Sequence, residues 1–150
     1  MYNENFMRAA LEQAGNAALH GEVPVGSVIT FDGKIISVGS NRCISKNSAV
    51  RHAEIEAIES ACDFLSNYRI PNTSIYITLE PCHMCCMAIV NARIKNIFFG
   101  AKEPKTGAVV SVDNFLDRDF LNHKVNYSGG HMESESAELL RDFFATKRKI

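Results

Sequence analysis

The sequence predicts an α/β protein with one mixed sheet of about five strands and helices on both of its faces. Two observations support this fold class. The first is a strong hairpin signal, because Asp32-Gly33 separates two runs of β-forming residues. The second is the alternation of strand-like and helix-like segments along the middle of the chain. The order of the strands within the sheet does not follow from these patterns.

The first half of the chain is expected to place two helices around the hairpin. A stripe of apolar residues predicts a helix over residues 3–20, which ends before Pro24. The two hairpin strands are expected at residues 25–31 and 34–39. After a polar loop, a helix is predicted over residues 52–65 by apolar residues that recur every three or four positions, namely Ile55, Ile58, Cys62 and Leu65.

The second half is expected to alternate strands and helices. Alternating apolar residues predict a strand at 75–79, and a helix with a proline in its first turn follows over 81–92. That helix is apolar nearly all round, so we expect it to be buried. Further strands are expected at 94–100 and 124–128. A last helix over 134–147 has an apolar face that consists of Leu139, Leu140, Phe143 and Phe144.

Length and composition describe an ordinary globular chain. With 150 residues, of which 46% are hydrophobic and 22% charged, the chain can bury a sizeable core, and one domain over residues 1–150 is expected. The net charge of −1 gives no general reason to expect a nucleic-acid partner, because phosphate binding usually accompanies a basic excess. A local basic patch is still compatible with this total, and its candidates are Arg42, Lys46, Arg51, Arg93, Lys102 and Lys105.

The five cysteines indicate reduced thiols rather than a disulfide framework. Their number is odd, and Cys82, Cys85 and Cys86 are clustered, which favours metal binding or catalysis. The start of the chain carries Glu4 and Glu12 where a secretory segment would need an apolar run. No stretch approaches the roughly 20 apolar residues of a membrane span. We therefore expect a cytoplasmic protein with no membrane partner.

One pair of short motifs can carry chemistry: His52-Ala53-Glu54, and Pro81 to Cys85 farther along the chain. Cys82 and Cys85 lie three positions apart at an expected helix start, so both thiols face the same side of the first turn. The positive end of a helix stabilises thiolates there. A metal held by this pair needs further ligands, and His52, at the start of another helix, is the plausible third.

Three protein ligands are typical of a catalytic zinc site, in which the fourth position is open for water. A closed structural site would need a fourth ligand, and His83 and Cys86 are the candidates. Both lie about 100° round the helix from a ligand cysteine and should point away from the metal. The alternatives are a structural zinc site and a redox-active C-x-x-C pair, although a redox pair would not need the His-x-Glu element.

Glu54 favours the catalytic alternative. It lies two residues after His52 on the same first turn, so its carboxylate can face a metal-bound water without binding the metal. Zinc lowers the pKa of such a water towards about 7. A neighbouring carboxylate can then take the proton and pass it to a ring nitrogen and to a leaving amine. The alternative is a solvated glutamate that the helix dipole favours.

The combination of His-x-Glu with Pro-Cys-x-x-Cys resembles the signature of the zinc nucleoside and nucleobase deaminases. Within that superfamily the chain is similar, almost from end to end, to the wobble-position tRNA adenosine deaminases. Four stretches favour these tRNA enzymes over free-base deaminases: Phe99-Gly100-Ala101, Lys105-Thr106-Gly107-Ala108, Asn122-His123 and Asp142-Phe143-Phe144.

The resemblance implies the three-layer α/β/α fold of the cytidine deaminases, with a central mixed five-stranded sheet. It implies hydrolytic deamination of adenosine to inosine at the wobble position of an arginine tRNA anticodon. It also implies one Zn²⁺ per subunit, bound by His52, Cys82 and Cys85, with Glu54 as the proton shuttle. The active form would be a homodimer, and the apolar surroundings of residues 88–94 could extend into its interface.

For the tRNA substrate, the resemblance implies two groups of contacts. Asn41 and the Ala53 backbone would contact the flipped base, and the flanking nucleotides would contact Glu103, Lys105, Phe143, Phe144 and Arg148. Without the resemblance, an asparagine in a polar loop is more often a turn residue. Likewise, aromatic residues at helical spacing are more often part of the core, so we expect Phe143 or Phe144 to be buried.

The chain departs from the family pattern in three places. Cys86-Met87 replaces two small residues, Glu103 replaces a more usual aspartate, and Ser40 stands where some relatives have a large aromatic residue. Two other functions remain open. One is a zinc deaminase of a free guanine, cytosine or cytidine, which the near-neutral charge favours. The other is a non-catalytic zinc-dependent RNA-binding module, which would have no use for Glu54.

Overall fold

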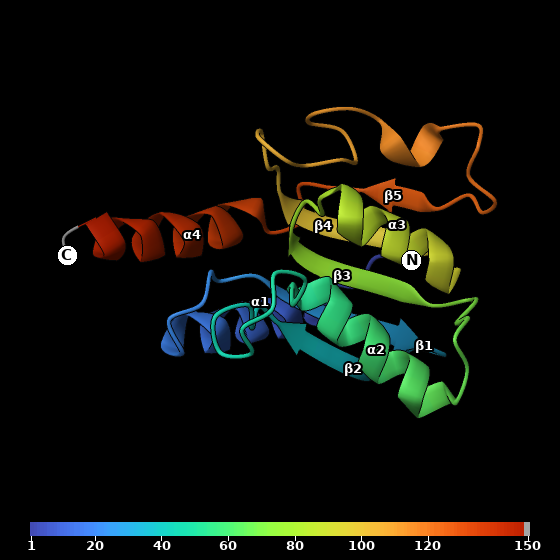
Figure 1. Ribbon diagram of the computed structural model, residues 1–150, viewed down its shortest axis with the longest axis horizontal. Helices are drawn as coiled ribbons and strands as arrows, with labels where there is room; N and C mark the ends of the chain where they lie inside the picture. The colour runs from blue at the N-terminus through green and yellow to red at the C-terminus, as the bar shows by residue number, and fades with distance from the viewer. Residues whose placement is uncertain (149–150) are drawn as a thin grey trace.

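A computed structural model describes residues 1–148, which form a five-stranded sheet between two layers of helices (Figure 1). The strand order is β2-β1-β3-β4-β5. β1 is antiparallel to β2 and to β3, whereas β3, β4 and β5 are parallel. The predicted mixed sheet and α/β class are confirmed. The strands are β1 (Gly26–Phe31), β2 (Lys34–Ser40), β3 (Ser74–Leu79), β4 (Asn96–Ala101) and β5 (Asn126–Ser128).

The helices cover both faces of the sheet. α1 and α4 lie against one face, and α2 and α3 lie against the other. No helix within residues 1–148 is long and apolar enough to cross a membrane. The bounds are α1 (Glu4–Leu19), α2 (Ala53–Leu65), α3 (His83–Ala92) and α4 (Glu133–Arg148), with a short 3₁₀ helix at Phe115–Asp117.

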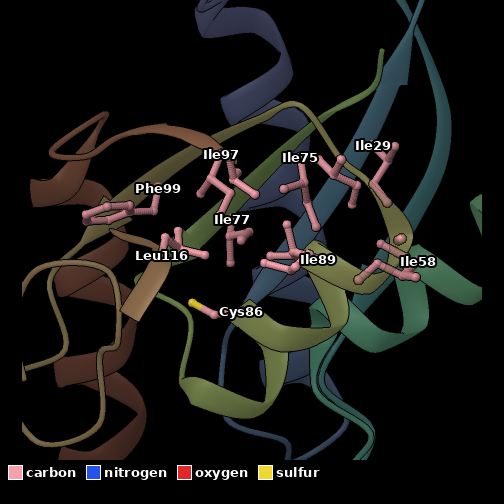
Figure 2. Packing of buried hydrophobic residues seen from close by; sticks show 14 of the residues in the cluster. Ile29, Ile58, Ile75, Ile77, Cys86, Ile89, Ile97, Phe99 and Leu116 are labelled. Carbon is pink, nitrogen blue, oxygen red and sulfur yellow. The ribbon is translucent and has the colours of Figure 1, made fainter. Parts of the chain in front are cut away.

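Alternation along β3 divides the core into two unequal parts. Ile75 and Ile77 are buried against α2 and α3, together with Ile89, as Figure 2 shows. Tyr76 points to the opposite face, where it packs with Met7 of α1 in a smaller cluster. Because successive side chains of a strand point to opposite faces, one apolar strand supplies both cores.

The hairpin forms where Asp32-Gly33 predicts it. Both residues have positive φ, at 54° and 74°, as a two-residue type I′ turn requires. A second glycine, Gly39 on β2, allows a close helix contact, because a Cβ there would overlap the carbonyl oxygen of Ala53. The first turn of α2 therefore lies directly on β2, which fixes the position of the residues at the start of that helix.

Two details of the predicted helices are wrong. α3 begins at His83, so Cys82 is its N-cap and Pro81 precedes the helix instead of lying in its first turn. α4 does not bury its apolar face: Ser136 is its one buried residue within the described chain, Phe143 is half-buried and Phe144 is 44% exposed. Both phenylalanines belong to the C-terminal half of α4, and in Figure 1 the last turns of this helix extend past the ends of the strands.

Candidate active site

Three side chains that can bind a metal converge where α2 and α3 begin. His52 is the N-cap of α2, Cys82 is the N-cap of α3, and Cys85 lies in the first turn of α3. The Nδ1 atom of His52 lies 3.8 Å from the Sγ atom of Cys82 and 3.5 Å from that of Cys85. Within residues 1–148, no other three His, Cys, Asp or Glu residues gather their ligand atoms in this way.

The local backbone leaves these side chains free to bind an ion. His52 and Cys82 have the extended conformation of N-cap residues, yet neither side chain caps its own helix. A hydrogen bond from the Cys85 thiol, together with the nearby His52, lowers the pKa of Cys82 to about 4 despite its partial burial. This environment favours the thiolate form of Cys82, which is the form that binds a metal.

The two neighbouring candidates for a fourth ligand point elsewhere. His83 is exposed, and its Nε2 atom lies 3.0 Å from both carboxylate oxygens of Asp113. Cys86 is buried in the core beside Ile89 and Leu116 (Figure 2), where burial raises the pKa of its thiol. The geometry therefore presents three ligands and an open side, which suits a catalytic metal better than a structural one.

Glu54 lies beside this trio in the first turn of α2. Its side chain is 3% exposed, and its Oε1 atom has no hydrogen-bond partner among residues 1–148. Burial raises the pKa of the carboxyl group to about 7, although the nearby His52 opposes the increase. Because a buried polar atom without a partner is costly, this carboxylate is arranged to meet a group supplied from outside the chain.

A pocket of about 290 Å³ opens above these residues, and His52, Glu54 and Cys82 form its floor. Its size is at the lower end of the roughly 300–1,000 Å³ typical of ligand pockets. It lies at the carboxyl ends of the parallel strands β3 and β4, where ligands of open α/β sheets usually bind. The other lining residues are Glu22, Val23, Val25, Asn41, Cys43, Ile44, Leu79, Glu80, Glu103 and Thr106.

Asn41 is a wall residue of this pocket and not merely a turn residue. Its Oδ1 atom accepts a hydrogen bond from the Ala53 N–H at 2.8 Å. This contact fixes the orientation of the side-chain amide, because only the oxygen can accept from a backbone N–H. The Nδ2 group is left as a donor, and the Ala53 N–H serves to hold Asn41.

Other residues expected to bind substrate do not line the pocket. Phe143, Phe144 and Arg148 lie on the projecting part of α4, and Lys105 lies in the loop that supplies Glu103 and Thr106. The Oε1 atom of Glu103 accepts a hydrogen bond from the Lys105 N–H at 3.0 Å. The longer side chain at position 103 thus stabilises its own loop.

The six basic candidates do not form one patch. Lys46 and Arg51 lie 3.2 and 3.0 Å from the carboxylate of Glu56, and Arg42 lies 3.8 Å from it. Arg93 caps the far end of α3, about 12 Å along the helix from Cys85. Of the six residues, Lys102 and Lys105 flank the pocket residue Glu103.

Sequence reasoning missed two buried carboxylates that hold the walls. Glu22 accepts hydrogen bonds from the backbone N–H groups of Ile44 and Ser45, at 3.1 and 2.7 Å. Glu80 does the same for the loop after β4. In the sequence, each of these glutamates stands among apolar residues and one or two positions before a proline. This pattern is only a weak signal, because charged residues are rarely fully buried.

The fold and site are those of a deaminase, because a model of the MafB19-like deaminase family matches residues 1–148. A tRNA-specific adenosine deaminase of Agrobacterium fabrum is 44% identical over 144 residues, which cover 96% of this chain and 95% of that protein. The tRNA-specific adenosine deaminase of Haemophilus influenzae is 40% identical over 99% of this chain and 86% of its own.

Solved structures agree with these relatives. A structure from a study of A-to-I editing by tRNA:A34 deaminases at the wobble position has a TM-score of 0.90 and 42% identity, over 92% of this chain and all of the other. A guanine deaminase from Nitrosomonas europaea has a TM-score of 0.79 at 20% identity over 96% of this chain and 85% of its own, and supports the fold alone. The chain therefore belongs to the MafB19-like deaminases and, among them, to the tRNA-specific adenosine deaminases.

Proposed function

We propose that this chain hydrolyses adenosine to inosine at the wobble position of a tRNA anticodon, with an arginine tRNA as its substrate. The observation that carries the proposal is Glu54, a buried carboxylate with an unpartnered oxygen beside three metal-ligating atoms. It lies at the floor of a pocket of about 290 Å³, large enough for one flipped base. A cytoplasmic location would follow from the tRNA substrate.

The metal that suits this donor set is zinc, one ion per subunit. In a tetrahedral site with bonds of about 2.3 Å to sulfur and 2.0–2.1 Å to nitrogen, S···N separations are about 3.6 Å. The two separations from His52 Nδ1 are 3.5 and 3.8 Å, so the site needs little rearrangement to hold the ion. When bound, zinc supplies a Lewis acid that makes water nucleophilic at neutral pH.

The residues of the chain then supply binding, orientation and proton transfer. Glu54 takes one proton from the attacking water and delivers it to the base ring, then takes the second proton of that water and gives it to the departing amino group, so that adenosine and water become inosine and ammonia. Asn41 donates from Nδ2 to the base while the Ala53 N–H holds its amide. The apolar side chains of Val25, Ile44 and Leu79 exclude other water molecules.

Nucleotides that flank the target base would contact Glu103, Lys105, Phe143, Phe144 and Arg148. The exposure of Phe144 supports this assignment, since single-stranded bases stack on exposed aromatic rings. A homodimer is part of the same proposal. Its support is apolar residues on α3 and in the loop after β4 that are not buried within the chain, where Met87 is half-buried and Val112 is 49% exposed.

The decisive experiment measures inosine formation on a transcribed stem-loop of an arginine tRNA anticodon. Free adenosine, guanine, cytosine and cytidine are assayed in parallel, with and without a zinc chelator. Conversion of the stem-loop alone, abolished by the chelator and restored by zinc, is the expected result. Conversion of a free base or nucleoside with an inert stem-loop would overturn the tRNA substrate, and binding of the stem-loop without any turnover would indicate a non-catalytic module.

A further inference from the structure

Glu80 lies between the metal-ligating segment and one wall of the pocket. It follows β3 and precedes Pro81-Cys82, and its backbone N–H donates to the Ala101 carbonyl at 2.8 Å, which continues the ladder between β3 and β4. Its side chain is 2% exposed. The carboxylate is therefore fixed by the sheet on one side and points at the loop that leaves β4 on the other.

Both carboxylate oxygens of Glu80 are occupied by donors from that loop. Oε1 accepts from the Glu103 N–H at 3.1 Å and from the Ser111 hydroxyl. Oε2 accepts from the N–H groups of Val109, Val110 and Ser111, at 3.1, 2.8 and 3.0 Å. Burial alone would raise the pKa of this group, but these hydrogen bonds outweigh it and hold the pKa below its ordinary value.

The loop is folded around this carboxylate. Residues 102–114 consist largely of turns and bends, so their shape depends on contacts with the rest of the chain. A Cβ on Gly107 would overlap the Glu80 carboxyl group, which shows how closely the loop passes. The Ala108 N–H also donates to the Pro81 carbonyl at 2.9 Å. The wall loop is thus attached directly to the segment that presents Cys82.

We infer that Glu80 is a positioning residue for the deamination: by gathering the amides of residues 103–111, it holds Glu103 and Thr106 at a fixed distance from the metal-ligating floor and so determines how well the substrate fits. This inference rests on the proposed function. Glu80 also lines the pocket, but both of its carboxylate oxygens are occupied by hydrogen bonds from the loop, so its effect on the reaction passes through the wall residues that it holds.

Glu80→Gln tests this inference selectively. The glutamine oxygen can replace Oε2 and accept from three N–H groups, whereas the new NH₂ group would face the Glu103 N–H as donor against donor. The Ser111 hydroxyl can rotate and accept instead. The substitution therefore leaves the loop in place but releases the backbone of the wall residue Glu103. Tyr76→Phe is the matched control, because it loses hydrogen bonds of the same strand, to Asn3 and Met1, on the opposite face.

Kinetics are measured on whichever substrate the wild-type chain converts, with zinc content determined for every variant. For Glu80→Gln we expect kcat/KM to fall about tenfold, mainly through KM, because the wall binds substrate and transition state alike. Tyr76→Phe should stay within about twofold of wild type. In a Glu103→Ala background, Glu80→Gln should cost less than about threefold, because the wall side chain that Glu80 positions is already absent. The inference would be overturned if Glu80→Gln lowered kcat/KM by the same factor with and without Glu103→Ala. It would also be overturned if Glu80→Gln and Tyr76→Phe lowered kcat/KM equally.

Amide hydrogen exchange separates this inference from the proposed function. In Glu80→Gln the Glu103 amide should exchange about tenfold faster than in wild type, since its partner is gone, and Tyr76→Phe should leave that rate unchanged. Unaltered exchange in Glu80→Gln would show that Glu80 does not hold the wall. Faster exchange together with an inert stem-loop would retain the positioning role and reject only the tRNA substrate.

Discussion

The floor and the walls of the pocket are built in different ways. The floor consists of side chains at the starts of two helices, where His52 and Cys82 are N-caps and Glu54 and Cys85 lie within the first turn. The walls are two loops whose backbones are held by buried carboxylates from distant parts of the chain, as when Glu22 binds the amide of Ile44. The residues that carry the chemistry belong to two short motifs at helix starts, whereas the shape that receives the substrate depends on single buried carboxylates that bind the backbone of a loop.

The largest effect is expected from a change to the floor. Cys82→Ser should reduce zinc to below about a tenth of an ion per subunit and abolish turnover, because it removes one of three protein ligands. Metal content by mass spectrometry and inosine formation check this outcome. Cys86→Ala is the control, since this thiol lies in the core: it should keep both zinc and activity while lowering the free energy of unfolding by about 1 kcal/mol. Zinc loss in the control instead would make Cys86 a ligand.

Glu54→Ala should separate metal binding from proton transfer within the floor. Turnover should fall about 10²–10⁴-fold, which corresponds to roughly 3–5 kcal/mol of activation free energy, because the variant removes the unpartnered carboxylate beside the candidate ligands that would carry the proton. Zinc content should be unchanged. The free energy of unfolding should not decrease by more than about 1 kcal/mol, because the lost side chain is an unpartnered buried carboxylate. If zinc is lost, Glu54 is a ligand and the proton shuttle is wrong.

Substitutions of Asn41, a wall residue hydrogen-bonded to the first turn of α2, test how much the wall contributes to kcat/KM. Asn41→Ala should lower kcat/KM about 10- to 100-fold, or roughly 1–3 kcal/mol, because it removes both the donor to the base and the acceptor for the Ala53 N–H. Asn41→Asp keeps an oxygen for Ala53 and removes only the Nδ2 donor. Equal losses in the two variants would assign the whole effect to the contact with the base. A nearly active aspartate variant would instead assign it to the structural contact.

The wall carboxylates should make stability depend on pH. Hydrogen bonds from Ser45 and Ile44 outweigh the effect of burial and hold the pKa of Glu22 below its ordinary value of 4.5. A group with a lowered pKa in the folded state stabilises the fold above 4.5 and loses this contribution as the pH falls through the folded-state pKa. Urea unfolding between pH 3 and 6 should therefore show a smaller decline in Glu22→Gln than in wild type. Its free energy of unfolding at pH 7 should be lower by about 1–3 kcal/mol.

The same difference explains what the sequence could predict. The Asp32-Gly33 hairpin and the presence of a helix after Pro81 follow from local preferences, although the exact start at His83 does not, and the fold class follows from the succession of elements. The partners of Glu80 lie 23 to 31 positions away and in a loop of turns, so no spacing in the sequence announces them. The pairing of β1 with β3, which places β1 between β2 and β3, likewise depends on residues far apart in the sequence. Helical spacing predicted that Phe143 or Phe144 is buried, and this prediction was wrong. The spacing shows which residues share a face of the helix, but it does not show whether another element covers that face.

The smallest effect on the fold is expected at that projecting helix, which lies outside both floor and wall. Phe144 is 44% exposed, so Phe144→Ala should change the free energy of unfolding by less than about 0.5 kcal/mol. If its ring stacks on a flanking nucleotide, the variant should raise KM for the stem-loop by about 5- to 50-fold, a loss of roughly 1–2 kcal/mol of stacking.

Phe64→Ala is the matched control for Phe144→Ala, because Phe64 is 66% exposed near the end of α2, away from the helix start that forms the floor. Its KM for the stem-loop should equal that of wild type. A five-nucleotide substrate centred on the target adenosine then locates the stacked base. If that base lies outside the five nucleotides, Phe144→Ala should no longer raise KM. If it is adjacent to the target, the increase in KM should persist. An unchanged KM for the complete stem-loop would remove α4 from the RNA-binding surface and leave substrate choice to the two walls.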